Sequence, residues 1–234
     1  MAAQRFDQSL IRGLSIFQAM NDADLDAVLA MASVRRLVEG TAAFTQGHEA
    51  TEFFCLLNGC LKVTQTTLDG QQVVVRHVNP GDIFGIAMAM RRPDYPATAV
   101  AIVESLVLAW SSSQWESFIA RCPTLAANAL QTVGQRLQDA HTRILELSTE
   151  EVERRVAHAV LRLTRQAGRK TDEGLLIDFP VTRQDIAEMT GTTLHTVSRV
   201  MAAWEAKGLI TSSRKRVVVV DAHRLYMLAE RSGD

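Results

Sequence analysis

The chain has 234 residues, of which 47% are hydrophobic and 22% charged, and its 25 Lys and Arg nearly balance 26 Asp and Glu. This length suffices for two domains, each with its own core. The sequence contains neither a long apolar run nor a basic segment followed by an apolar one, so we expect a cytoplasmic protein that does not enter a membrane.

The first part of the chain predicts short helices and then an antiparallel β-roll. Apolar residues in the range 6–31 recur at helical spacing, with Asn21 or Asp22 as a helix cap. After this range the period changes to two, and turn pairs such as Asn58-Gly59 separate short runs. Many short strands at regular spacing are typical of a small antiparallel barrel or roll. The expected strands are 34–38, 41–46, 52–57, 61–66, 73–78, 98–103 and 106–110.

The three cysteines do not form a recognisable ligand set. Cys55 and Cys60 flank the Asn58-Gly59 turn, Cys122 lies far along the chain, and the sequence has no Cys-x-x-Cys or Cys/His zinc spacing. An odd number of cysteines in a cytoplasmic chain argues against a disulfide framework. All three are expected to be buried thiols, because free cysteine is among the most buried residue types.

A long helix is predicted after Pro123. Its apolar residues alternate steps of four and three, which is the a/d pattern of a coiled-coil seam over about three heptads. The alternative is a helix packed only on its own domain, but the narrow apolar stripe favours a partner helix and therefore a parallel homodimer. The predicted seam consists of Ala126, Leu130, Val133, Leu137, Ala140, Ile144 and Leu147.

The rest of the chain begins and ends with further helices. Residues 149–170 continue as helix, residues 168–174 are expected to form a polar loop, and residues 175–179 fit a strand. A last short helix is predicted within residues 221–231. Between these elements the sequence has the pattern of two short helices joined by a glycine turn.

Thr182 is the predicted cap of the first short helix, and Asp185 lies near the positive end of that helix. Gly191 permits the turn that ends this helix, and Thr192 or Thr193 caps the second one. Such a pair is typical of a helix-turn-helix whose second helix enters a DNA major groove. An ordinary helical hairpin is the alternative on this local pattern alone. The apolar face of the second helix is expected to consist of Leu194, Val197, Met201 and Trp204.

A β-hairpin with a basic tip is predicted next. Two short helices followed by such a hairpin make a winged helix, which favours the DNA-binding interpretation. Residues 182–216 hold six basic and three acidic residues, a local excess suited to phosphates despite a whole-chain charge of −1. We expect His195, Ser198 and Arg199 to contact bases. The expected phosphate contacts are Thr182, Thr193, Thr196, Arg214, Lys215 and Arg216.

A β-roll, a dimerisation helix and a winged helix in this order resemble the Crp/Fnr family of bacterial transcription regulators. The resemblance rests on the glycine turns of the roll, on Pro80-Gly81-Asp82-Ile83-Phe84-Gly85, and on Thr182-Arg-Gln-Asp-Ile-Ala through Thr196-Val-Ser-Arg199. It implies an α+β fold with a cyclic-nucleotide-binding-like sensor roll (1–122), a dimerisation helix (123–148) and a DNA-binding domain (149–234). It also implies a homodimer that binds an inverted repeat in double-stranded DNA and acts with RNA polymerase.

The roll lacks the ligand residues that two classes of this family carry. Members that bind cyclic AMP carry a Glu after the Phe-Gly pair and an Arg-Ser pair further on, where this chain has Ile86, Pro96 and Ala97. A buried phosphate without its cation is destabilised, which argues against cyclic AMP. Iron–sulfur members need a cluster of N-terminal cysteines, but no cysteine precedes Cys55, which argues against such a cluster.

The segment Leu194-His195-Thr-Val-Ser-Arg199 also departs from the family, because many members place Glu where His195 stands. With Gly85-Ile-Ala-Met-Ala-Met and Tyr95-Pro-Ala-Thr it is similar to the NnrR-type branch, which regulates nitrite and nitric oxide reductase genes in denitrifying bacteria. That resemblance implies a response to nitric oxide through haem. A haem needs an axial ligand, and the histidines in question are His48, His77 and His141, none of which is assigned.

Other classes of function are left as alternatives. The roll is compatible with another small ligand or with none, and a β-roll module whose helical tail docks a protein would make the basic tip incidental. An enzyme is not expected, because the sequence has no Gly-x-Ser-x-Gly, no P-loop, no metal-ligand spacing and no Ser/His/Asp set.

Overall fold

A computed structural model of the chain describes residues 11–230, so the part of the predicted N-terminal helices over residues 6–10 lies outside the described residues. The chain forms two compact units, and the division passes through helix α4 (Pro123–Thr149) between Gln138 and Asp139. The segment Gly70–Val75 groups with the second unit. Within residues 11–230, no helix is long and apolar enough to cross a membrane.

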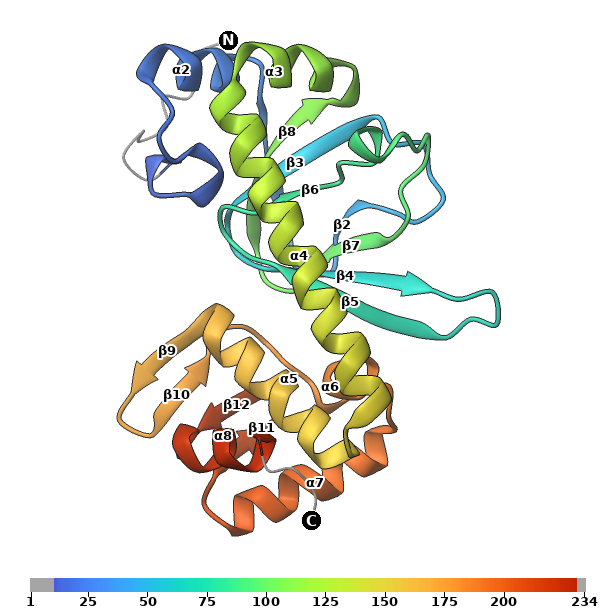
Figure 1. Cartoon of the computed structure of the whole chain (residues 1–234), viewed down its shortest axis with the longest axis vertical. Helices are drawn as coiled ribbons and strands as arrows, with labels where there is room; N and C mark the ends of the chain where they lie inside the picture. Colours follow the sequence, from blue (N-terminus) through green and yellow to red (C-terminus); the bar gives the residue numbers. More distant parts are fainter. Residues whose placement is uncertain (1–10, 231–234) are drawn as a thin grey trace. The chain divides into compact units, whose positions relative to one another are not determined.

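The first unit is built on a β-roll of two four-stranded antiparallel sheets, as the sequence predicted (Figure 1). One sheet has the strand order β1-β8-β3-β6 and the other β2-β7-β4-β5. The strands are β1 (Ser33–Leu37), β2 (Ala42–Phe44), β3 (Glu52–Asn58), β4 (Leu61–Thr66), β5 (Gln72–Val78), β6 (Ile83–Phe84), β7 (Thr98–Ala101) and β8 (Ser105–Ser111). Only β6 was not predicted, because two residues are too few to show a period.

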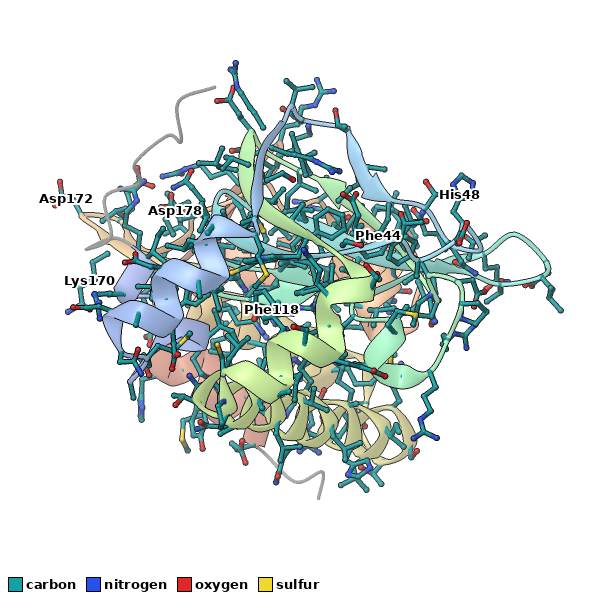
Figure 2. The ribbon with its side chains drawn as sticks, turned by 90° about the horizontal axis from the view of Figure 1, so that it is seen from above. Phe44, His48, Phe118, Lys170, Asp172 and Asp178 are labelled. Atoms are coloured by element: carbon teal, nitrogen blue, oxygen red, sulfur yellow. The ribbon has the colours of Figure 1, made fainter. Side chains whose placement is uncertain are left out.

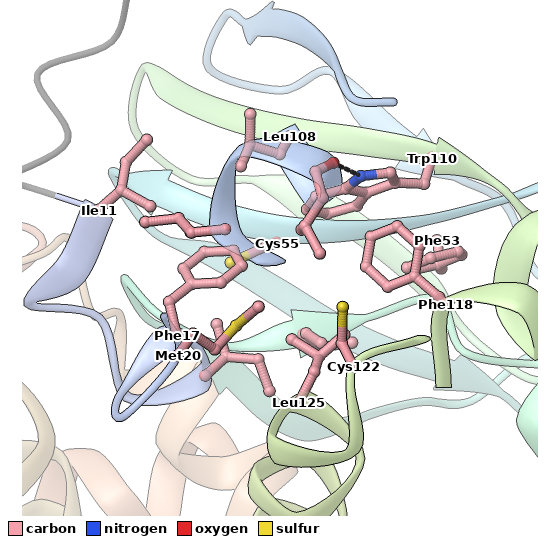
Figure 3. Packing of buried hydrophobic residues seen from close by; sticks show 14 residues of the cluster. Ile11, Phe17, Met20, Phe53, Cys55, Leu108, Trp110, Phe118, Cys122 and Leu125 are labelled. Carbon is pink, nitrogen blue, oxygen red and sulfur yellow. Dashed lines mark hydrogen bonds between the residues drawn. The ribbon is translucent and has the colours of Figure 1, made fainter. Parts of the chain in front are cut away.

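Short helices cover one face of the roll and close its core. They are η1 (Ser15–Phe17), α2 (Asp22–Ala30) and α3 (Trp115–Arg121), and two further short turns, η2 (Met88–Met90) and η3 (Ser112–Gln114), lie within the roll segment. The side chain of Asn21 accepts a hydrogen bond from the Asp24 backbone and so caps α2. The indole of Trp110 stacks on Phe53 and donates to the backbone oxygen of Val28 at 2.9 Å, which ties β8 to α2 (Figure 3).

The three cysteines are free and buried, which confirms their prediction as buried thiols. Cys55 and Cys122 belong to the aromatic core around Trp110 (Figure 3). Burial, with a smaller effect of the Asp82 charge, raises the pKa of Cys60 to about 12 and raises that of Cys55 as well. The thiols of Cys55 and Cys60 therefore stay protonated and unreactive at neutral pH.

The second unit combines helices with a four-stranded sheet of order β11-β12-β10-β9. Its elements are α5 (Val152–Ala167), β9 (Gly168–Thr171), β10 (Gly174–Ile177), α6 (Arg183–Thr190), α7 (Leu194–Ala206), β11 (Ile210–Ser213), β12 (Arg216–Val219) and α8 (Ala222–Glu230). The predicted helix over residues 149–170 is shorter than expected. It begins at Val152, after an extended Glu151, and ends at Ala167.

The predicted polar loop over residues 168–174 was wrong, because these residues form the β9–β10 hairpin. Its strand β9 lies at the edge of the sheet and carries mostly exposed polar side chains, so it lacks the alternating apolar pattern of a half-buried strand. Gly174 closes the hairpin at φ +134°, where an added Cβ would lie 2.4 Å from the backbone oxygen of Val219. The backbone of β12 thus requires glycine here.

A buried ion pair joins the end of α4 to α5. Arg162 donates to the Glu146 carboxylate at 2.5 and 2.7 Å, and the two side chains are only 15% and 8% exposed. Arg143, one turn earlier on α4, donates to the backbone oxygen of Val75. Burial and the neighbouring Arg162 charge lower the pKa of Arg143, while Glu146 opposes that shift. Glu146 is therefore the counter-charge of Arg162, and together with Asp139 it favours the charged form of Arg143.

Candidate nucleic-acid interface

Helix α6 begins with a reciprocal cap formed by Thr182 and Asp185. The backbone N–H of Asp185 donates to the Thr182 hydroxyl at 3.0 Å. In return, the backbone N–H and the hydroxyl of Thr182 donate to the Asp185 carboxylate at 2.9 and 2.6 Å. The capping role is confirmed. Because both Thr182 donors are engaged with Asp185, a phosphate would have to replace that carboxylate to bind them.

The turn and the start of α7 follow the predicted chemistry. Gly191 ends α6 in the left-handed conformation at φ +60°. Of the two threonines considered, Thr193 is the cap, since its hydroxyl accepts from the backbone N–H of Thr196 at 3.2 Å. The hydroxyls of Thr193 and Thr196 lie 3.0 Å apart, so the two expected phosphate contacts occupy one place at the beginning of α7.

The inner face of α7 is fully buried. Val197, Met201 and Trp204 have no accessible surface, and the indole of Trp204 donates to the carboxylate of Glu153 on α5 at 2.9 Å. The prediction that Leu194 belongs to this face was wrong, because its side chain is 47% exposed. Long side chains in helices point toward the N-terminus, and the first residue has no preceding turn to pack on.

The outer face of α7 carries the residues predicted to contact bases. His195 and Arg199 are exposed and lie one turn apart, and the exposed Ala202 continues the same face. Ser198 lies on the flank of this face and is half-buried. A rigidly held inner face with arginine and histidine exposed near the N-terminal end is the arrangement of a helix that reads base edges.

The wing is the β11–β12 hairpin, residues 210–219. Its tip is a two-residue turn of Arg214 and Lys215, both of which are exposed. Lys215 adopts a left-handed φ of +62°, and its backbone oxygen accepts from Val181 at 3.2 Å. Arg216 lies just inside the turn and donates to the carboxylate of Glu173 at 2.9 Å. Arg214 and Lys215 therefore place two positive charges at the tip, and Arg216 forms an ion pair just inside it.

A polar cluster that sequence reasoning missed fixes the wing to both helices. Arg183 at the start of α6 donates to the Ser212 hydroxyl at 3.1 Å and lies 3.7 Å from the Glu205 carboxylate of α7. Ser212 in turn donates to Glu205. Arg183 lies more than twenty positions before both Glu205 and Ser212, and no spacing rule links the three residues, so this cluster could not be predicted from the sequence.

Two known domain families match the chain in the order that the structure shows. Residues 34–122 match the cyclic nucleotide-binding domain, and residues 154–228 match the Crp-like helix-turn-helix domain. The chain belongs to the Crp/Fnr family of transcription regulators. It is a DNA-binding regulator of the Crp/Fnr type, and the resemblance to this family inferred from the sequence is confirmed.

Several Crp/Fnr proteins are similar to this chain over nearly its whole length. The cyclic AMP receptor protein of Thermus thermophilus is 28% identical over 94% of this chain and 98% of its own. The transcriptional activator protein FnrA of Stutzerimonas stutzeri is 24% identical over 94% and 90%. The structure of FixK2 from Bradyrhizobium japonicum has the same fold, with a TM-score of 0.74 and 22% identity over 86% of this chain and 99% of that chain.

In this Crp/Fnr roll, one carboxylate holds two guanidinium groups. Asp82 lies 3.4 Å from Arg76 and 3.3 Å from Arg136 of α4, and Arg136 also donates to the backbone oxygen of Ile83 at 2.8 Å. Burial, reinforced by the Arg136 charge, lowers the pKa of Arg76 to about 10, and Asp82 opposes this shift. These two arginines are thus directed at an internal carboxylate.

The histidines considered as haem ligands occupy different surroundings. His48 is exposed and projects outward from the roll (Figure 2), and His141 on α4 is exposed as well. His77 on β5 is buried, with 5% of its surface accessible. The three side chains therefore do not share one environment, and the structure assigns no ligand among them.

The predicted dimer seam lies open on α4. Leu130 is 73% exposed, Leu137 57% and Ile144 59%, and Val133, Ala140 and Leu147 are exposed as well, whereas Ala126 is half-buried. Large apolar side chains in a row on a solvent-facing helix are costly to leave in water. Such a stripe is expected where a second helix packs.

Proposed function

We propose that the protein is a homodimer whose two α7 helices read an inverted repeat in double-stranded DNA. Arg199, Ser198 and His195 would contact base edges in the major groove of each half-site, with half-sites about 34–36 Å apart. The observation that carries the proposal is the outer face of α7, where Arg199 and His195 are exposed on a helix whose inner face is fully buried.

Phosphate contacts from the helix starts and the wing would set the register on DNA. Thr193, Thr196, Arg214 and Lys215 are placed for this role, with Thr182 and Arg216 contributing after exchange of their acidic partners. The domains would be the sensor roll (1–122), the dimerisation helix (123–148) and the DNA-binding domain (149–234). RNA polymerase is the partner through which a Crp/Fnr regulator would act on transcription.

Replacing Leu137 with glutamate is expected to prevent dimerisation. The substitution puts a charge at the centre of the apolar stripe, where a partner helix would remove it from water. Sedimentation velocity should show monomers for Leu137→Glu, and binding to a two-half-site duplex should weaken strongly. Gln131→Glu adds the same charge to an exposed position of α4 outside the seam and should leave a dimer. A Leu137→Glu protein that remains dimeric would refute the seam.

Replacing Lys215 with asparagine is expected to weaken binding to all DNA sequences equally. Asparagine tolerates the left-handed φ of this position, so the change removes charge without adding strain. The slope of log affinity against log salt should fall by about 1 for each subunit. Arg36→Gln, on an exposed position of β1, should not change the slope. A change in base preference for Lys215→Asn would contradict its role as a phosphate contact.

For the effector, we infer that the protein responds to nitric oxide through haem and controls denitrification genes. Support comes from the sequence resemblance of Leu194–Arg199 and of the roll to the NnrR-type branch. Ile86, Pro96 and Ala97 stand where cyclic-AMP-binding members carry their ribose and phosphate ligands, and Arg76 and Arg136 are directed at Asp82. We therefore expect no cyclic AMP binding, and no iron–sulfur cluster.

The test is an anaerobic absorption spectrum of the purified protein with haem, before and after nitric oxide, with binding to a selected operator duplex on the same samples. A stoichiometric Soret band that shifts with nitric oxide and changes DNA affinity would support a haem sensor. Single substitutions of His48, His77 and His141 would then identify the ligand. Absence of saturable haem binding would contradict the haem proposal and leave the DNA-reading proposal intact.

A further inference from the structure

Leu194 is an exposed apolar residue at the N-terminal start of α7, the part of the helix that would meet DNA in the proposed function. It is the first residue of the helix, and 47% of its surface is accessible, whereas Val197 is fully buried. About half of the Leu194 surface thus remains accessible in the isolated protein. In the proposed function this accessible apolar surface would lie beside DNA.

The neighbours of Leu194 determine which group can reach it. Thr193 and Thr196 bond to each other at the helix cap, His195 lies on the outer face, and Ser198 lies one turn further along the same side. The Leu194 side chain projects from the N-terminal end of the helix, which is the end that contacts base edges in a helix-turn-helix protein. It can neither donate nor accept a hydrogen bond, so it can recognise only apolar surface.

The major groove offers one strong apolar feature, the C5-methyl group of thymine. Leu194 and Arg199 are five residues apart, about 7.5 Å along a helix axis or about two base-pair steps. We propose that Leu194 contacts a thymine methyl group within about two base pairs of the guanine read by Arg199. This proposal rests on the proposed function and makes Leu194 a specificity-determining residue that prefers thymine over cytosine in each half-site.

The experiment separates the methyl group from every other property of the base. A duplex is first selected from a randomised library with the wild-type protein, and each thymine of one half-site is then replaced singly by 2′-deoxyuridine. Loss of one methyl contact should weaken wild-type binding about fourfold at one position. The Leu194→Ala protein should bind the thymine and deoxyuridine duplexes equally at that position, and Leu194→Met should retain the response.

A second pair of duplexes tests the same contact in the opposite direction. Cytosine in place of the critical thymine should weaken wild-type binding, and 5-methylcytosine should recover about fourfold relative to cytosine. Leu194→Ala should show no such recovery. Thermal unfolding of each variant should match the wild type, because Leu194 is exposed and alanine favours helix.

Two outcomes would overturn the proposal. One is an equal response of wild type and Leu194→Ala to deoxyuridine at every position, and the other is a selected half-site without thymine on either strand near the guanine. Binding of Arg199→Ala to the same duplexes distinguishes a failure of the proposed function from a failure of the role proposed for Leu194. If it loses guanine discrimination while Leu194 shows no coupling to the methyl group, the proposed function stands and the assignment of Leu194 fails.

Discussion

Replacing Arg199 with alanine is expected to cost about 1–3 kcal/mol of discrimination at one guanine in each half-site. The guanidinium is exposed on the outer face of α7 and can donate twice to O6 and N7 of guanine, which no alanine can do. Competition binding with duplexes that vary one position at a time measures this directly. The variant should tolerate any base at one position and keep its preferences elsewhere.

Arg199→Lys is the matched control, since it keeps the positive charge but not the planar pair of donors. It should retain the salt dependence of binding and lose much of the guanine preference. An equal loss of affinity for every sequence in Arg199→Ala would mean that Arg199 contacts phosphate, and base reading would then have to rest on His195 and Ser198.

Glu146→Gln is expected to destabilise the second unit by about 3–5 kcal/mol. The substitution leaves the buried Arg162 without its counter-charge, and Arg143 adds a second guanidinium to the same place. Chemical unfolding followed by the fluorescence of Trp204, which packs on α5 through Glu153, reports on this unit. The midpoint should move to markedly lower denaturant.

The double variant Glu146→Gln/Arg162→Met removes both charges and should recover a large part of the lost stability. Asp178→Asn is a control in the same unit, because its partner Arg169 and Asp178 itself are 58% and 51% exposed. Its unfolding transition should stay close to that of the wild type. A Glu146→Gln protein as stable as this control would contradict the prediction that Arg162 depends on Glu146 for its counter-charge.

The elements that sequence alone predicted well are those with a local signal. Thr182 with Asp185 marked a helix start, and Gly191 marked the turn that ends α6, because each of these features depends on residues within a few positions of one another. Asn58-Gly59 also marked a turn, but the turn joins β3 to β4 of the other sheet and does not close a hairpin. The order of roll, long helix and winged helix followed from the changes of period along the chain. The family followed from the resemblance of that order, and of the motifs around Gly81 and Arg199, to Crp/Fnr proteins.

Other features could not be predicted from the sequence, because they depend on contacts between distant residues or on where a helix begins. Leu194 continues the apolar spacing of α7, so the sequence predicted a core position. It is exposed in the structure, because it is the first residue of the helix. Glu146 lies between the seam residues Ile144 and Leu147 and has the sequence context of a solvated residue, yet it forms an ion pair with Arg162 sixteen positions later. The cluster of Arg183, Glu205 and Ser212 likewise joins three separate elements.

Strand β9 is an edge strand of the four-stranded sheet in the second unit. Its free side would otherwise present unpaired backbone groups to the strands of other molecules, the usual start of aggregation. The strand is short, and its exposed Arg169 and Lys170 lie on the hairpin that also carries Asp172 (Figure 2). Arg169 pairs with Asp178, and the charged Lys170 beside it disfavours the pairing of another strand along this edge. The same polar residues that prevented the prediction of β9 from the sequence therefore disfavour edge-to-edge pairing between copies of the protein.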